Sequence, residues 1–215
     1  MLRFFFALSG ILRVSCVPGL VDRPLCLALA AGSCSSDMSL AVPMGIFFEL
    51  FWLDRLELGN VVSPSGSLSL LLLFPLAGIF SLRDPAVLAV PLICVLPLAC
   101  VGAFVERRLR VRGDRLLGEV ACWTAGRGGI SPETAVRRAC LLRAGAHFLL
   151  YLACFTALFF LFRALAEDGM PAIAMANWPM LHAVALMGAV LSLRTKQAYI
   201  ALIGGLAALV LMVRV

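Results

Sequence analysis

Long, uninterrupted runs of apolar residues constrain this chain more than any other feature of its sequence. The clearest runs are 67–82, 86–105 and 146–166. Each approaches the ~20 residues that a helix needs to cross the hydrocarbon core of a bilayer. The runs are continuous rather than alternating, which argues against a transmembrane β-barrel. Hydrophobic residues make up 62% of the chain and its mean hydropathy is +1.03, whereas soluble domains are roughly 45–50% apolar. The sequence therefore predicts an all-α, polytopic helical membrane protein.

Three further apolar segments, 4–20, 171–193 and 198–213, complete a predicted set of six spans. The first segment begins like a signal peptide, but Arg13 interrupts it and no clean A-x-A cleavage site follows. We interpret it as a retained membrane segment. The whole chain, 1–215, is predicted to be one transmembrane domain. Its parts are a first helical half with broken helices (4–105), a cytoplasmic amphipathic segment (106–145) and the C-terminal spans (146–213).

The first half contains apolar stretches that are too short or too interrupted to span a membrane alone. The stretch 21–32 fits a short or re-entrant helix, which is tolerated at membrane depth only where protein or a water-filled cavity shields its backbone. A second apolar stretch, 38–53, leads into the polar break GNVVSPSGS at 59–67. Interrupted helices near mid-membrane expose helix ends that can bind a polar substrate. The break is equally compatible with a plain loop outside the membrane.

The basic residues are concentrated in one region. The chain has 18 basic residues, 17 of them Arg, and nine of these lie between Arg107 and Arg143. An excess of Arg and Lys marks cytoplasmic loops, so 106–143 is predicted to lie on the cytoplasmic side. Apolar residues recur at helical spacing within it, which predicts an interfacial amphipathic helix with its basic face on the lipid headgroups. Nucleic acid is not an expected partner, because no groove-reading element accompanies the charge.

Acidic residues lie within and just after the second apolar stretch, where a charge is energetically costly. A charge at the bilayer centre costs roughly 2.5–3.5 kcal/mol on insertion scales, yet Glu49 lies within FFELFWL. At about 100° per residue, Glu49 and Glu57 would lie within a quarter turn of each other on one helix. They could then form a polar stripe facing a cavity. In the alternative interpretation, residues 54–57 have already reached the interface and are solvated.

Catalytic motifs are absent from the sequence. It contains no GxSxG, HExxH, GxxxxGK[ST] or CxxC pattern, and the eight Cys lie mostly in apolar runs. We therefore predict no metal, no cofactor and no enzymatic activity of the chain itself. His147 and His182 are the only histidines. His182 is expected either to bond to a neighbouring helix, the favoured interpretation, or to face a pore.

Three stretches in order resemble a known family. They are DRPLCLALAAG (22–32), MSLAVPMGIFFELFWLDRLELGNVVSPSG (38–66), and the basic region 106–143 followed by NWPMLHAVALMG (177–188). The second is the most specific, with Gly45, Glu49, Gly59 and Pro64 at the positions of the signature. The chain resembles the membrane subunit IIC of the mannose/fructose/sorbose family of the phosphoenolpyruvate-dependent sugar phosphotransferase system.

The resemblance implies a hexose-conducting subunit of the bacterial inner membrane. Its partners would be the membrane subunit IID, with which it would form a homo-oligomer of IIC–IID units, membrane lipid, and soluble IIA and IIB proteins that supply the phosphoryl group. Glu49 would be the main hexose-binding carboxylate. The same site would include Asp22, Glu57, Asn60, Ser63 and Ser65.

One residue departs from the family pattern. An acidic or amide residue usually follows the signature Pro, but this chain has Ser65. The alternative is a non-transporting membrane scaffold or sensor whose basic region docks cytoplasmic proteins.

Overall fold

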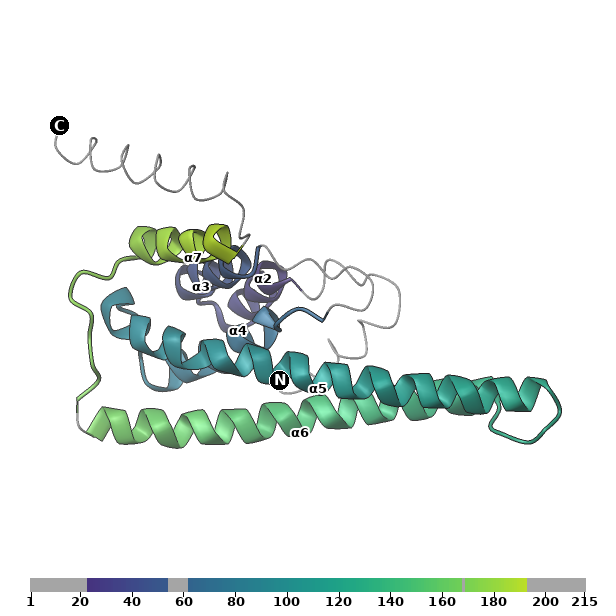
Figure 1. The fold of residues 1–215 in the computed structure, drawn as a ribbon. Coiled ribbons are helices and arrows are strands. Elements are labelled where there is room, and N and C mark those ends of the chain that lie inside the picture. The colour runs from purple at the N-terminus through teal and green to yellow at the C-terminus, as the bar shows by residue number, and fades with distance from the viewer. Residues whose placement is uncertain (1–22, 54–61, 168, 193–215) are drawn as a thin grey trace.

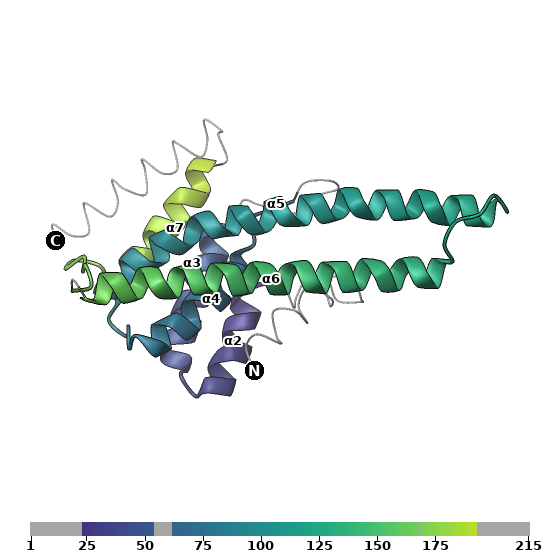
Figure 2. The ribbon, with the colours of Figure 1, turned by 90° about the horizontal axis from the view of Figure 1, so that it is seen from below.

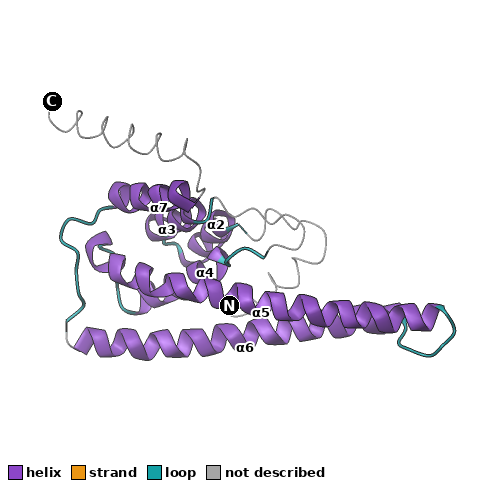
Figure 3. Ribbon diagram, viewed as in Figure 1, coloured by secondary structure: helices purple, strands orange, loops and turns teal. Residues whose placement is uncertain are grey.

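A computed structural model of the chain describes residues 23–53, 62–167 and 169–192. These residues form six helices and no strand (Figure 3). The helices are α2 (Pro24–Ser35), α3 (Met38–Phe51), α4 (Gly66–Ile79), α5 (Pro85–Thr124), α6 (Pro132–Glu167) and α7 (Trp178–Ser192). The prediction of an all-helical chain is confirmed for this part. The predicted spans 4–20 and 198–213 lie outside the described residues.

Two of the helices, α5 and α6, are long and apolar enough to cross a membrane. They contain the predicted spans 86–105 and 146–166 and run antiparallel, side by side (Figures 1 and 2). The four shorter helices gather at the end of this pair that is formed by the start of α5 and the end of α6 (Figure 1). At 1.5 Å per residue, the 40 residues of α5 extend about 60 Å.

Most of the basic region is helical, as the spacing of its apolar residues predicts, but its helices are continuous with the apolar runs on either side. Helix α5 continues without a break through the arginines to Thr124, and α6 begins at Pro132. The turn between them contains Gly126, Gly128 and Gly129, all with positive φ. The amphipathic segment 106–145 is therefore the far end of a helical hairpin, and it projects beyond the short helices (Figure 2).

Helix α4 is buried on nearly all sides. Eleven of its 14 residues, from Gly66 to Ala77, are buried, and it packs on α2, α3, α5 and α6. A helix that is apolar all round belongs in the interior of a protein or in a membrane. The predicted span 67–82 is longer than α4, which extends only about 21 Å. Two side-chain hydrogen bonds join α4 to its neighbours. Ser69 Oγ of α4 donates to the Val95 carbonyl of α5 (3.3 Å), and the Tyr151 hydroxyl of α6 donates to the Leu71 carbonyl of α4 (3.4 Å).

Two other predicted elements differ in length from those observed. The short helix expected at 21–32 is present as α2, from Pro24 to Ser35. The span expected at 171–193 is shorter, because α7 begins only at Trp178. Asn177 sets this start, since its side-chain oxygen accepts from the Met180 N–H (2.9 Å).

Helices α2 and α3 form a tight antiparallel pair joined at Ser36 and Asp37. Glycines bring them together. A Cβ added at Gly45 would lie 2.5 Å from the Ala28 Cβ, and one added at Gly32 would lie 2.8 Å from the Ala41 Cβ. Small residues that let helix backbones approach closely are a common basis of helix packing in membranes.

Replacing Gly45 by alanine is therefore expected to destabilise the protein by about 1–2 kcal/mol, because overpacking outweighs the gain in helix propensity. The matched control is Gly145→Ala on α6, where an added Cβ meets nothing within 4 Å. That variant is expected to be neutral or slightly stabilised. Thermal unfolding of the two purified variants in detergent measures the contrast. Equal midpoints for the two would contradict the close packing of α2 on α3.

Candidate functional site

Glu49 lies near the end of α3 and points to the beginning of α2. Its Oε1 accepts from Arg23 Nη1 (2.9 Å), and its Oε2 accepts from the Leu25 N–H (3.5 Å). The glutamate side chain is 22% exposed and that of Arg23 is 52% exposed. The carboxylate is thus paired with a cation and is not surrounded only by apolar groups.

The position of Glu49 follows from the chemistry of a helix start. The first N–H groups of a helix have no partner within the helix, and Pro24 at the first position of α2 contributes none. Leu25 is then the first N–H that needs an acceptor. A carboxylate at this end is also favoured by the helix dipole. Glu49, 24 residues after Leu25, supplies both the acceptor for this N–H and the negative charge that the helix dipole favours.

The start of α4 touches the start of α2. A Cβ added at Gly66 would lie 2.9 Å from Pro24 Cγ and 3.0 Å from Trp52 Cδ1, so Gly66 fills a narrow contact between α2, α3 and α4. Ser65 caps α4, because its Oγ accepts from the Leu68 N–H (3.3 Å). The Ser65 N–H donates to the Ala99 carbonyl of α5 (3.1 Å). Two helix N-termini therefore meet beside the Glu49–Arg23 pair.

We call the group formed by Arg23, Glu49 and Ser65 the helix-start site. It combines a carboxylate, which accepts hydrogen bonds, with a guanidinium, which donates up to five. Both groups are partly exposed at the surface of the chain. Nothing in it resembles a nucleophile with an adjacent base. Among the described residues, no group of three His, Cys, Asp or Glu is placed to hold a metal ion.

Of the remaining predicted site residues, the structure describes only Ser63. Ser63 lies, half-buried, in the non-helical segment 62–65 that leads into α4. Asp22, Glu57 and Asn60 lie outside the described residues. One expectation is wrong: α3 ends at Phe51, so Glu49 and Glu57 do not share one continuous helix, and the quarter-turn relation between them does not apply.

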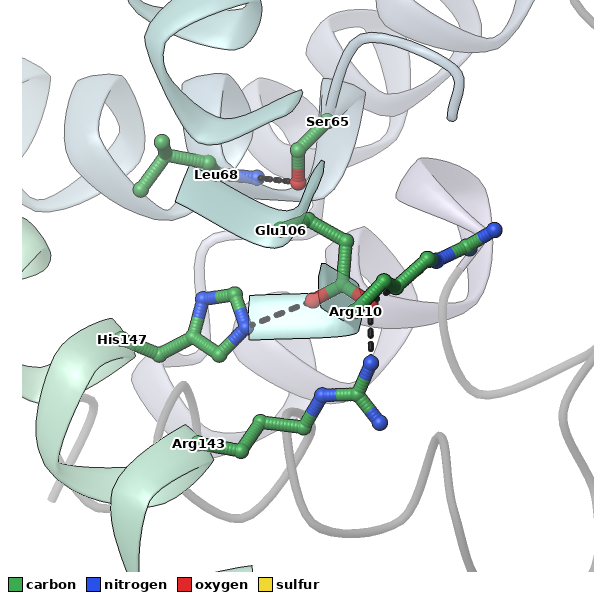
Figure 4. A network of polar contacts seen from close by, with 6 residues as sticks. All are labelled: Ser65, Leu68, Glu106, Arg110, Arg143 and His147. Carbon is green, nitrogen blue, oxygen red and sulfur yellow. Dashed lines mark hydrogen bonds and ion pairs between the residues drawn. The ribbon is translucent and has the colours of Figure 1, made fainter. Parts of the chain in front are cut away.

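A second polar cluster lies between α5 and α6 (Figure 4). We call it the Glu106 cluster, and it comprises Glu106, Arg110, Arg143 and His147. Glu106 is 2% exposed. Its Oε1 accepts from Arg110 Nε (3.3 Å) and from Arg143 Nη2, and its Oε2 lies 3.3 Å from His147 Nε2. Buried carboxylates are costly unless they are paired and hydrogen-bonded, and this one has at least three partners.

The Glu106 cluster lies next to the cap of α4. Gly102 is one helical turn before Glu106, and a Cβ there would lie 3.2 Å from the Ser65 Cβ and 3.0 Å from Leu68 Cδ2. Figure 4 accordingly shows Ser65 and Leu68 close to Glu106. The start of α4 therefore contacts the start of α2 through Gly66, and it contacts the turn of α5 that precedes Glu106 through Ser65 and Leu68.

Sequence reasoning did not find the Glu106 cluster, although a signal exists. Glu106 and Arg110 are four residues apart, as are Arg143 and His147, so each pair lies on one helix face. The two pairs also lie at similar distances from the glycine-rich turn between α5 and α6. An antiparallel hairpin that turns there brings the pairs together.

His182 bonds to a neighbouring helix, as the favoured interpretation predicted. Its Nε2 donates to the Pro43 carbonyl of α3 (2.9 Å), and its ring stacks on Trp178 at a centroid distance of 5.8 Å. This hydrogen bond joins α7 to α3, so His182 is not part of the helix-start site.

Comparison of the chain with protein families, with curated proteins and with solved structures found no match. The geometry of the described residues and the sequence resemblance are therefore the grounds for a functional proposal.

Proposed function

We propose that this chain is a polytopic protein of the bacterial inner membrane that conducts a hexose, in the manner of a IIC subunit of the mannose/fructose/sorbose phosphotransferase family. The two long apolar helices support a membrane location. The short, closely packed helices α2, α3 and α4 support a substrate path, because interrupted helices are where transporters bind polar cargo. On this proposal residues 106–143 face the cytoplasm.

One observation carries the proposal. Glu49, the residue that the resemblance assigns to hexose binding, is held by Arg23 at the junction of two helix N-termini. Sugar hydroxyls both donate and accept hydrogen bonds. A hexose that binds here would donate to the Glu49 carboxylate and accept from Arg23. The N-termini of α2 and α4 add positive potential, which suits hydroxyl oxygens.

Phosphoryl transfer is assigned to partner proteins. The only two histidines of the chain are turned to internal partners, His147 to Glu106 and His182 to the Pro43 carbonyl. A phosphoryl-accepting histidine would need to be exposed to a phosphodonor. The proposal therefore keeps IID as the membrane partner and soluble IIA and IIB as the source of the phosphoryl group.

The alternative function is a non-transporting scaffold or sensor. The exposed arginines on the far half of the α5–α6 hairpin favour it, because they form a basic surface that could dock cytoplasmic proteins. In that case the hairpin arginines Arg107, Arg108 and Arg110 would be essential and Glu49 would be dispensable.

The test is uptake of labelled hexoses (mannose, fructose, sorbose and glucose) into cells that co-express IID, IIA and IIB. Glu49→Gln is expected to reduce uptake at least roughly tenfold, because a hydrogen bond to a charged group contributes about 1.5–3 kcal/mol. The matched control is Glu167→Gln, which removes a carboxylate that is 70% exposed and paired with Arg163. It should transport like the wild type.

A structural role for Glu49 is separated from a binding role by a second measurement. The glutamine amide keeps an oxygen that can accept from the Leu25 N–H, so the thermal midpoint of Glu49→Gln should stay close to that of the wild type. Unchanged uptake by Glu49→Gln would refute the site. Uptake lost together with thermal stability would assign Glu49 to structure alone.

A further inference from the structure

The outer face of α5 changes from apolar to basic at one place, where the apolar run of the helix ends. A surface hollow of about 440 Å³ lies there, between α5 and the neighbouring turn of α6. Phe104, Val105 and Ala146 line one end, which is apolar. Arg108, Arg112 and Arg115 line the other end together with the apolar Leu109 and Val111. We call it the boundary hollow.

The lining follows from helix geometry. Phe104, Arg108, Arg112 and Arg115 are spaced by four, four and three residues, so they lie on one face of α5. Phe104 and Val105 come first along the axis, and the three cations follow over a total length of about 16 Å, with Leu109 and Val111 lining the hollow between them. The hollow therefore has one end suited to hydrocarbon and one end suited to an anion.

The cations of the hollow have no carboxylate partner in the part of the chain that the structure describes. Arg108 lies over the Phe104 ring, 5.0 Å from its centroid. Neither Asp114 nor Glu119, the acids on this stretch of α5, forms an ion pair with Arg108, Arg112 or Arg115. Arg110, on a different face of the same helix, is by contrast used by Glu106. Three neighbouring guanidinium groups are thus left to attract an anion.

We propose that the boundary hollow binds an anionic phospholipid. The phosphate is held by Arg108, Arg112 and Arg115, since guanidinium groups match phosphate in both charge and geometry. One acyl chain lies along Phe104, Val105 and Ala146. The cytoplasmic leaflet, where the positive-inside rule places this region, supplies such lipids. An acidic protein would match the arginines but would not need the apolar end.

This inference rests on the membrane location in the proposed function and not on sugar conduction. The two can therefore fail separately. Lipid binding is measured on the purified chain, without partners or sugar, whereas hexose uptake is measured in cells.

The experiment is native mass spectrometry of the full chain released from detergent. The probes are phosphatidylglycerol and phosphatidylcholine with identical acyl chains. The wild type is expected to retain phosphatidylglycerol at least fivefold more than phosphatidylcholine. The triple variant Arg108→Gln, Arg112→Gln, Arg115→Gln should lose this preference. The matched control, Arg127→Gln, Arg137→Gln, Arg138→Gln, removes the same charge from the same hairpin outside the hollow and should keep it.

Three results would overturn the proposal. Equal retention of the two lipids by the wild type is the first, and equal loss of preference in both triple variants is the second, since it would indicate unspecific attraction. The third is competition by glycerol phosphate at the same concentration as the lipid, because a free phosphate ester does not use the apolar end. The single variant Arg112→Gln, with an expected partial loss, keeps the test valid if the triple variant does not fold.

Discussion

Replacing Glu106 by glutamine is expected to lower the free energy of unfolding by about 3 kcal/mol, since it removes one partner of a buried ion pair. The glutamine cannot neutralise Arg110 and Arg143, which would then face each other at the former position of the carboxylate. Loss of a buried partner typically costs about 3–5 kcal/mol, and we take the lower end because both arginines are partly exposed and can turn toward water. Thermal or denaturant unfolding in detergent micelles measures the loss.

Two further variants separate the charge from the side-chain shape. Glu119→Gln removes an exposed carboxylate from the same helix and should change stability by no more than about 0.5 kcal/mol. The double variant Glu106→Gln, Arg143→Gln should recover part of the loss, because it removes one of the two unpaired cations. If Glu106→Gln were as stable as Glu119→Gln, the cluster would not hold α5 to α6.

Leu72→Ala is expected to cost about 2–3 kcal/mol, whereas Leu149→Ala should cost less than about 1 kcal/mol. Leu72 is fully buried in α4, and Leu149 on α6 is 65% exposed. In the proposed membrane location, lipid is as apolar as leucine, so the cost at Leu72 comes from the cavity left behind more than from transfer to water. Unfolding midpoints of the two variants under the same detergent conditions provide the measurement.

This comparison tests the position of α4 as well as its stability. A helix that faced lipid would tolerate the loss of a leucine on its outer side. Leu70→Ala and Leu73→Ala, which lie on other faces of α4 and are also fully buried, should therefore behave like Leu72→Ala. If one of them behaved like Leu149→Ala, that face of α4 would lie on lipid.

The sequence predicted correctly those helices that are both apolar in composition and long enough to span a membrane. The runs 86–105 and 146–166 lie in α5 and α6 because each is long, continuous and apolar. The run 67–82 has the same composition, but α4 ends at Ile79 and is enclosed by other helices. Hydropathy does not distinguish contact with lipid from contact with protein, so the sequence could not show that α4 is central.

The sequence also did not show that the helix in the charged region is continuous with the apolar run before it. Charge marks where a membrane segment ends, but it does not end a helix. Arg, Leu and Glu are strong helix formers, and the helix breakers come only with Gly126 and the glycines that follow it. Helix α5 therefore continues about 28 Å beyond Val105.

The sequence predicted one residue of the Glu49–Arg23 pair and not the other. Glu49 was found because a carboxylate in an apolar run needs an explanation, and the resemblance singled out the same residue. Its partner Arg23 lies 26 residues earlier in the chain, and only the packing of α2 on α3 brings the two side chains together. The sequence pattern alone does not show this pairing. The Glu106 cluster was missed because its acid was grouped with the arginines of a supposed surface segment, although it is among the most buried charged groups described.

The shortness of α2 and α3 has a consequence for the surrounding bilayer. These helices have 12 and 14 residues and extend about 18 and 21 Å, well below the ~30 Å of a typical hydrocarbon core. In the proposed location, such hydrophobic mismatch is relieved by local thinning of the bilayer or by neighbouring subunits. Thinning around the Glu49–Arg23 pair would shorten the low-dielectric barrier and so reduce the dehydration that a sugar undergoes while crossing.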